Sequence, residues 1–145
     1  MMRKSEFIDW ACDPATLTAA QLMQDALFTC TPRTDVLSIV RIMTKWNFGS
    51  LPVVEEDRTL VGLVSEYDVL QAVIEGRDLR KISAADIMTR QVLSVTEDMN
   101  LVQIANLFQD RYVTRLPVVR DKKLVGLVAR RDLLFGYAKA CQYWS

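Results

Sequence analysis

Apolar side chains recur at helical spacing in two separate stretches of the chain. In each stretch four residues occupy positions i, i+3, i+4 and i+7 of one helix face, namely Val36, Ile39, Val40 and Met43, and then Leu101, Ile104, Ala105 and Phe108. This spacing predicts two long amphipathic helices, because a period near 3.6 residues places all four side chains on the same face. Both faces are expected to belong to a hydrophobic core.

Each of these stretches is followed by two short apolar runs with a polar turn between them. The runs are "LPVV" and "LVGLV", at residues 51–54 and 60–64 and again at 116–119 and 124–128. Short apolar runs on either side of a turn are typical of an antiparallel strand pair. Gly62 and Gly126 thin the second strand of each pair, where another backbone or a ligand can approach closely.

Hydroxyl residues mark the starts of the remaining elements. Thr18 and Ser83 each precede a short helical stretch and have a polar residue three positions on, as N-caps do. A short strand follows, "LFTC" or "VLSV", and Thr31 or Thr96 then stands before the long helix as its expected cap. Each half therefore predicts helix, strand, helix, strand, strand, helix, and the chain is one structural unit used twice.

The repetition predicts an architecture as well as an order of elements. A short sheet with helices on one side leaves an apolar face, which a second copy of the same unit would cover. We expect an α/β (α+β) protein of two βαββα repeats, packed sheet to sheet with pseudo-twofold symmetry. The expected boundaries are an N-terminal extension at 1–16, a first repeat at 17–80, and a second repeat with its C-terminal helix and tail at 81–145. Two equivalent clefts would lie at the repeated phrases "GLVSEYDVL" and "GLVARRDLL".

Composition restricts the chemistry. The 145 residues include 18 basic and 18 acidic side chains, so bulk charge would recruit neither nucleic acid nor an anionic membrane. Histidine is absent, which removes the commonest general base and metal ligand, so we expect no catalytic residue and no metal site. Cys12, Cys30 and Cys141 lack metal-binding spacing and are expected to be buried or incidental thiols. With no secretory signal or membrane span in the sequence, the expected compartment is the cytoplasm.

On these features the sequence resembles a tandem pair of CBS domains, the module named after cystathionine β-synthase, over roughly residues 17–140. The matching features are the βαββα order, the "LPVV" strand and the phrase G-h-x-[ST]-x-x-D, complete in "GLVSEYD" and partial in "GLVARRD". The resemblance implies a non-enzymatic regulatory module that binds AMP, ADP or ATP and acts on a separate, unidentified protein. It also implies a homodimer, and it leaves open whether Mg²⁺ accompanies ATP.

The resemblance further implies the site residues. It places a ribose diol on Asp132 in one cleft and on Asp68 in the other, and an ionised carboxylate can accept hydrogen bonds from both hydroxyls. Arg115 and Arg131, helped by Arg130, would face the phosphates. The rest of the Asp132 cleft would be Thr31, Val36, Phe48, Ser50, Thr114, Leu127 and Ala129. The Asp68 cleft would add Ser65, Thr96, Leu63, Leu101 and Val113, together with Ser50.

The two clefts are predicted to be unequal. Where the second repeat has "ARRD" the first has "SEYD", so Glu66 and Tyr67 replace two arginines, and the glutamate would repel a phosphate. We therefore expect the Asp132 cleft to bind a nucleotide, and the Asp68 cleft to bind adenosine, a weaker phosphate ligand or nothing.

Three alternatives remain at this stage. Ser65 and Asp68 also have the spacing of a plain helix cap, which needs no ligand. A ligand-free dimerisation module would show the same repeat, and an enzyme is disfavoured by the missing histidine.

Large apolar residues near the chain ends are expected to pack on each other or across a dimer interface, namely Phe7, Ile8, Trp10, Tyr143 and Trp144.

Overall fold

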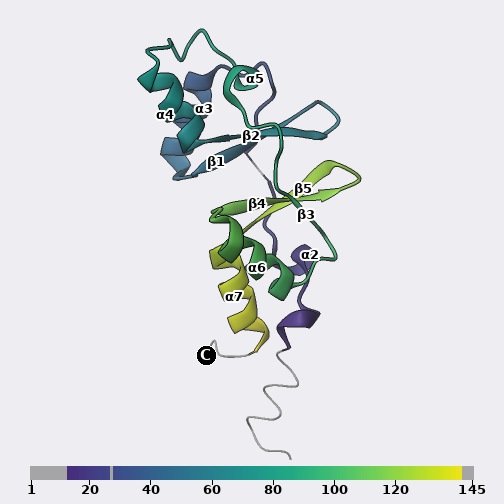
Figure 1. Ribbon diagram of the computed structural model, residues 1–145. Helices are drawn as coiled ribbons and strands as arrows, with labels where there is room; N and C mark the ends of the chain where they lie inside the picture. The colour runs from purple at the N-terminus through teal and green to yellow at the C-terminus, as the bar shows by residue number, and fades with distance from the viewer. Residues whose placement is uncertain (1–12, 27, 142–145) are drawn as a thin grey trace, which may run out of the picture. The chain divides into compact units, whose positions relative to one another are not determined.

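The computed structural model describes residues 13–26 and 28–141, so Cys12 and the five apolar residues near the chain ends lie outside the described residues. The chain divides into two compact units, drawn in Figure 1, and neither is one continuous stretch of sequence. Among the described residues, unit 1 combines 13–25 with 94–118 and 126–141, and unit 2 combines 26 and 28–93 with 119–125.

Unit 2 is built on an antiparallel strand pair. Its elements are α3 (Val36–Trp46), β1 (Ser50–Val54), β2 (Leu60–Ser65), α4 (Glu66–Ile74) and α5 (Ala84–Ile87). Ser50 of β1 pairs with Ser65 of β2. Of the strand predicted at "LFTC", the described residues 28–30 form a single parallel bridge, from Cys30 to Val53 of β1. Helix α3 packs on β1 and α4 on β2 (Figure 1).

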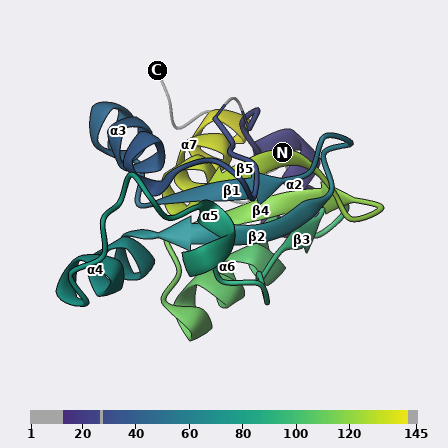
Figure 2. The same ribbon diagram turned by 90° about the horizontal axis from the view of Figure 1, so that it is seen from above.

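Unit 1 contains the same long helix, strand pair and following helix, but its short helix precedes them in the chain and a third strand joins its sheet. Its elements are the 3₁₀ turn η1 (Pro14–Thr16), α2 (Ala19–Leu22), β3 (Val95–Thr96), α6 (Leu101–Arg111), β4 (Arg115–Arg120), β5 (Lys123–Ala129) and α7 (Arg130–Ala140). The sheet has the strand order β3-β4-β5, visible from above in Figure 2, and the tip of the β4–β5 hairpin groups with unit 2. The predicted order of helices and strands along the chain is confirmed in the second half, and in the first half it is confirmed except at "LFTC", where residues 28–30 form an isolated bridge in place of a strand.

The apolar faces predicted for the two long helices are confirmed as core. The buried members are Val36, Ile39 and Met43 of α3 and Ile104 and Phe108 of α6, and the remaining three are half-buried. In unit 2 these residues pack with both strands and with the buried thiol of Cys30. Burial raises the pKa of Cys30 to about 12, so this thiol stays protonated and unreactive at neutral pH.

The predicted caps of the long helices are wrong. Helix α3 begins after Asp35, whose Oδ2 accepts the Ser38 N–H at 2.9 Å, and α6 begins after Asn100, whose Oδ1 accepts the Gln103 N–H at 3.0 Å. Thr31 lies in a separate turn four residues earlier, and Thr96 belongs to β3. An N-cap side chain must reach the N–H two or three residues further on. Asp35 and Asn100 are close enough to do so, whereas Thr31 and Thr96 lie four residues before them.

The short helices join the unit of the other repeat. Helix α2 groups with the elements of the second repeat, and α5 groups with those of the first. The reason lies at the starts of the long helices, where Val36 N–H donates to the Ile82 carbonyl at 3.0 Å and Leu101 N–H donates to the Leu17 carbonyl at 2.8 Å. Each incoming segment satisfies a helix-start donor that has no partner within its own helix. The compact units therefore differ from the repeat boundaries 17–80 and 81–145.

Candidate ligand-binding site

Each unit carries a carboxylate at the start of the helix that follows its antiparallel strand pair. Asp68 is the third residue of α4 and Asp132 the third residue of α7, and each follows directly on the second strand of its hairpin. Ser65 donates both its N–H and its hydroxyl to Asp68 Oδ2, at 2.8 and 2.9 Å, and its Oγ accepts the Asp68 N–H at 3.2 Å. Ala129 offers only its N–H, which donates to Asp132 Oδ2 at 2.7 Å.

A crossing segment lies against the second strand of each unit. Residue 24 bridges to Leu127 of β5 through two backbone hydrogen bonds of 2.8 Å, and Thr89 bridges to Leu63 of β2 through two of 2.9 Å. The glycine before each bridge makes room for it. A Cβ on Gly126 would lie 2.9 Å from the Gln24 carbonyl oxygen, which confirms the predicted close approach of a backbone.

At both glycines the nearest atom to a Cβ would be a methionine Sδ, at 2.5 Å. This sulfur belongs to Met23 at Gly126 and to Met88, the residue immediately before Thr89, at Gly62. The two glycines thus serve the same purpose. Gly126 lets the segment after α2 cross β5, and Gly62 lets the segment after α5 cross β2.

The crossing segments place two polar side chains beside the carboxylates, and neither was identified from the sequence. Gln24 Nε2 donates to Asp132 Oδ1 at 2.8 Å, whereas Thr89 Oγ1 lies 3.5 Å from both oxygens of Asp68. The available signal was the internal alignment of "AAQLMQ" with "AADIMT", in which Gln24 and Thr89 are equivalent.

Positive charge gathers near the Asp132 carboxylate. Arg115, the first residue of β4, is half-buried, and burial lowers its pKa while the nearby carboxylate of Asp132 opposes that shift. Arg130 and Arg131 are exposed at the start of α7. A guanidinium remains protonated under such conditions, so Arg115 is a half-buried cation in the same unit as the candidate ribose acceptor.

The three equivalent positions of unit 2 carry no positive charge. Ser50 is the first residue of β1, as Arg115 is of β4, and it is buried. Glu66 and Tyr67 occupy the places of Arg130 and Arg131, and both are exposed. The difference in charge between "ARRD" and "SEYD" thus lies at the exposed starts of α7 and α4, and the inequality of the two clefts stays a prediction.

The predicted site residues divide between the two units. Unit 1 contains Thr96, Leu101, Val113, Thr114, Arg115, Leu127, Ala129, Arg131 and Asp132, and unit 2 contains Thr31, Val36, Phe48, Ser50, Leu63, Ser65 and Asp68. Each predicted cleft draws on both units, so the composition of the clefts stays a prediction. Within each unit, the helix-start carboxylate accepts a hydrogen bond from the last residue of the preceding strand, Asp68 from Ser65 of β2 and Asp132 from Ala129 of β5. The side chain of Val36 lies wholly in the core.

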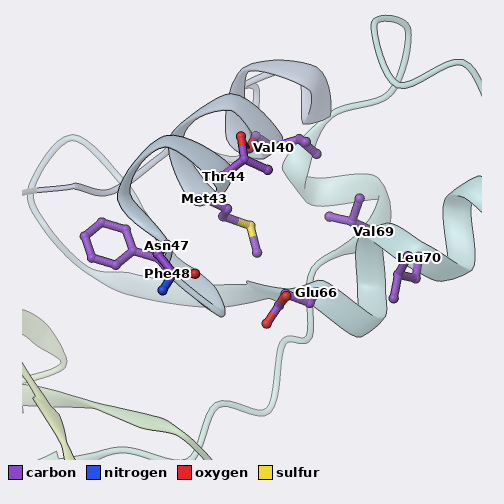
Figure 3. Close-up of a pocket in the computed structure, with 8 residues that line it drawn as sticks. All are labelled: Val40, Met43, Thr44, Asn47, Phe48, Glu66, Val69 and Leu70. Atoms are coloured by element: carbon purple, nitrogen blue, oxygen red, sulfur yellow. Dashed lines mark hydrogen bonds between the residues drawn. The ribbon is translucent and has the colours of Figure 1, made fainter. Parts of the chain in front are cut away.

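Among the described residues, each unit contains a groove of its own. In unit 2 a groove of about 390 Å³ separates α3 from α4, and Met43 and Val69 face each other across it (Figure 3). Phe48 and Glu66 also line this groove. In unit 1 a groove of about 500 Å³ lies between α2 and α7, and its lining includes both Gln24 and Asp132.

Within residues 13–26 and 28–141, no group of three acidic or cysteine side chains could hold a metal ion. No helix in the same range combines the length and apolar character needed to cross a membrane.

Comparison with known proteins agrees with this architecture. The CBS domain family model matches twice, at residues 19–75 and 84–139, and the chain belongs to the CBS domain family. It is 32% identical over 110 residues to the mitochondrial CBS domain-containing protein CBSX3 of Arabidopsis thaliana, covering 72% of this chain. The chain spans 53% of the length of that relative and 62% of an uncharacterized protein of Methanopyrus kandleri.

Solved structures of CBS pairs superpose closely. The crystal structure of CBSX2 in complex with AMP gives a TM-score of 0.74 at 30% identity and covers 85% of this chain and 97% of that one. The CBS domain pair of MJ0100, solved with 5-methylthioadenosine and S-adenosyl-L-methionine, gives 0.70 at 25% identity and covers 81% and 97%.

Proposed function

We propose that this chain is a regulatory module that binds an adenine nucleotide, AMP, ADP or ATP, between its CBS repeats and signals to a separate protein. The observation that carries the proposal is the helix-start carboxylate Asp132 with the half-buried cation Arg115 in the same unit. A carboxylate can accept both ribose hydroxyls, and a guanidinium can donate to a phosphate. The AMP complex of CBSX2, a protein of the same fold, supports an adenosine ligand.

A ligand panel tests this proposal. Isothermal titration calorimetry of the full chain with AMP, ADP, ATP, NAD, S-adenosylmethionine and adenosine, with and without Mg²⁺, would identify the ligand. Arg115→Ala should weaken AMP binding about tenfold or more, because hydrogen bonds to charged groups contribute roughly 1.5 to 3 kcal/mol. Adenosine has no phosphate and should bind this variant with unchanged affinity.

The matched control is Arg111→Ala, which removes an exposed arginine from the end of α6 in the same unit and should leave AMP binding unchanged. An equal loss in both variants would show that general charge, rather than a site at Arg115, attracts the nucleotide. If no compound of the panel binds, the proposed function is wrong.

The proposal includes a homodimer that forms through α4. Four large apolar side chains of this nine-residue helix are exposed, namely Tyr67 (85%), Leu70 (56%), Val73 (53%) and Ile74 (77%). Such a contiguous row exceeds the scattered apolar exposure of a monomer's surface. In a two-fold dimer each copy presents the same face to the other, so one row would cover its counterpart.

The same helix face favours a second candidate, a dimerisation module that binds no ligand. The two candidates differ in their thermal stability with ligand present. A nucleotide that binds only the folded chain must raise its melting temperature, whereas a ligand-free module would melt at the same temperature at every nucleotide concentration.

A further inference from the structure

The two helix-start carboxylates differ in how their oxygens are already used. Both oxygens of Asp132 accept a short hydrogen bond, Oδ1 from Gln24 Nε2 at 2.8 Å and Oδ2 from Ala129 N–H at 2.7 Å. At Asp68 the two short bonds from Ser65 both fall on Oδ2. Among the described residues, the side-chain donor at Asp68 Oδ1 is Thr89 at 3.5 Å, a distance at which a hydrogen bond is weak.

Gln24 is held in this place by the backbone. Its own N–H and carbonyl both bond to Leu127, and the bare Cα of Gly126 admits the segment against β5. Thr89 is held on Leu63 in the same manner in unit 2. The same backbone bridge therefore occurs in both units. The side chain beside the carboxylate differs, since it is Gln24 at Asp132 and Thr89 at Asp68.

The amide of Gln24 is accessible to a competitor. Gln24 is exposed, and it lines the groove of about 500 Å³ between α2 and α7 together with Asp132. A solute can reach the pair, and the amide has room to move aside. A hydroxyl that replaces it exchanges one hydrogen bond to a charged oxygen for another, so the ligand gains little from the exchange.

We propose that Gln24 competes with the ribose diol for Asp132, so that the Asp132 site and the Asp68 site prefer different classes of ligand. This inference rests on the proposed function. Neutral adenine nucleosides bind at Asp68, whose Oδ1 is available, whereas the Asp132 site accepts nucleotides whose phosphate interactions with arginine compensate for displacing the amide. Gln24 is thus a specificity-determining residue for the second repeat.

The experiment isolates each site and exchanges the two residues. In an Asp68→Ala background, where the Asp132 site remains, Gln24→Thr should strengthen adenosine binding about tenfold by calorimetry. Gln24→Met, which has a similar length but no donor, should do the same. In an Asp132→Ala background, where the Asp68 site remains, Thr89→Gln should weaken adenosine binding by a similar factor.

A second ligand separates this effect from a change in fold. Binding of 2′,3′-dideoxyadenosine, which lacks the diol, should be unaffected by either exchange. If adenosine affinity in the Asp68→Ala background is unchanged or lower in Gln24→Thr and Gln24→Met, the inference is overturned while the proposed function stands. If no adenine compound binds the wild-type chain or any variant, the proposed function fails and the inference fails with it.

Discussion

One hydroxyl group distinguishes the N-caps of the two hairpin-following helices. At α4 the Ser65 Oγ accepts the N–H of Asp68, and Asp68 returns a bond to the Ser65 N–H, which completes a capping box. At α7 Ala129 has no side-chain oxygen, so only the return bond from Asp132 remains. The Asp132 N–H therefore lacks the side-chain acceptor that the Asp68 N–H has.

We predict that the caps can be exchanged with opposite effects on stability. Ser65→Ala should lower the free energy of unfolding by about 1 kcal/mol, and Ala129→Ser should raise it by a similar amount. Urea unfolding followed by circular dichroism would measure both. A loss in Ser65→Ala without a gain in Ala129→Ser would mean that the serine at 129 cannot reach the Asp132 N–H.

At the level of elements, the structure depends on segments that cross a strand at a glycine. The segment after α2 lies on β5 at Gly126, and the segment after α5 lies on β2 at Gly62. The obstacles differ, because a Cβ on Gly126 would meet a backbone oxygen at 2.9 Å as well as a side chain, whereas the three atoms nearest to a Cβ on Gly62 all belong to the flexible Met88. A backbone atom cannot rotate away as a methionine can.

We therefore predict that Gly126→Ala destabilises the protein more than Gly62→Ala. Overpacking typically costs about 1 to 3 kcal/mol, and Gly126→Ala should lie near the upper value and Gly62→Ala near the lower. Gly76→Ala is the control, since its Cβ would have open space and its cost would come only from its positive φ of 72°. Equal losses at Gly62 and Gly126 in urea unfolding would contradict the role assigned to the Gln24 carbonyl.

At the scale of the whole molecule, the exposed row on α4 governs the proposed assembly. A charge in the centre of an apolar dimer interface would be buried without a partner, which is strongly unfavourable. The same charge on a solvent-exposed face would have little effect.

We predict that Leu70→Glu and Ile74→Glu convert the dimer to a monomer at micromolar concentration, as measured by light scattering. Gln91→Glu adds the same charge at an exposed polar position of unit 2 and should leave the dimer intact. A wild-type monomer at that concentration, or a dimer that survives both substitutions on α4, would rule out this interface.

Much of the local structure could be predicted from the sequence. The faces of α3 and α6 followed from the spacing of residues such as Ile39 and Ile104, since helical periodicity depends only on nearby positions. The caps at Thr31 and Thr96 were wrong because several capping residues stand before each long helix, and local sequence does not rank them. The replacement of two arginines by Glu66 and Tyr67 was visible from the repeat alignment, whereas the contact between Gln24 and Asp132 was not.

The sequence by itself determined the order of elements, the duplication, the two helix-start carboxylates and the membership of the CBS domain family, because each depends on residues that are near one another in the chain or on the match between its halves. Only the tertiary structure decided that α2 joins the second repeat and α5 the first, and that an amide faces one carboxylate and a distant hydroxyl the other. Gln24 and Asp132 are 108 positions apart, and their hydrogen bond forms because the backbone of residue 24 pairs with Leu127. Pairing of this kind depends on backbone groups that every residue carries, so it leaves little trace in the pattern of side chains.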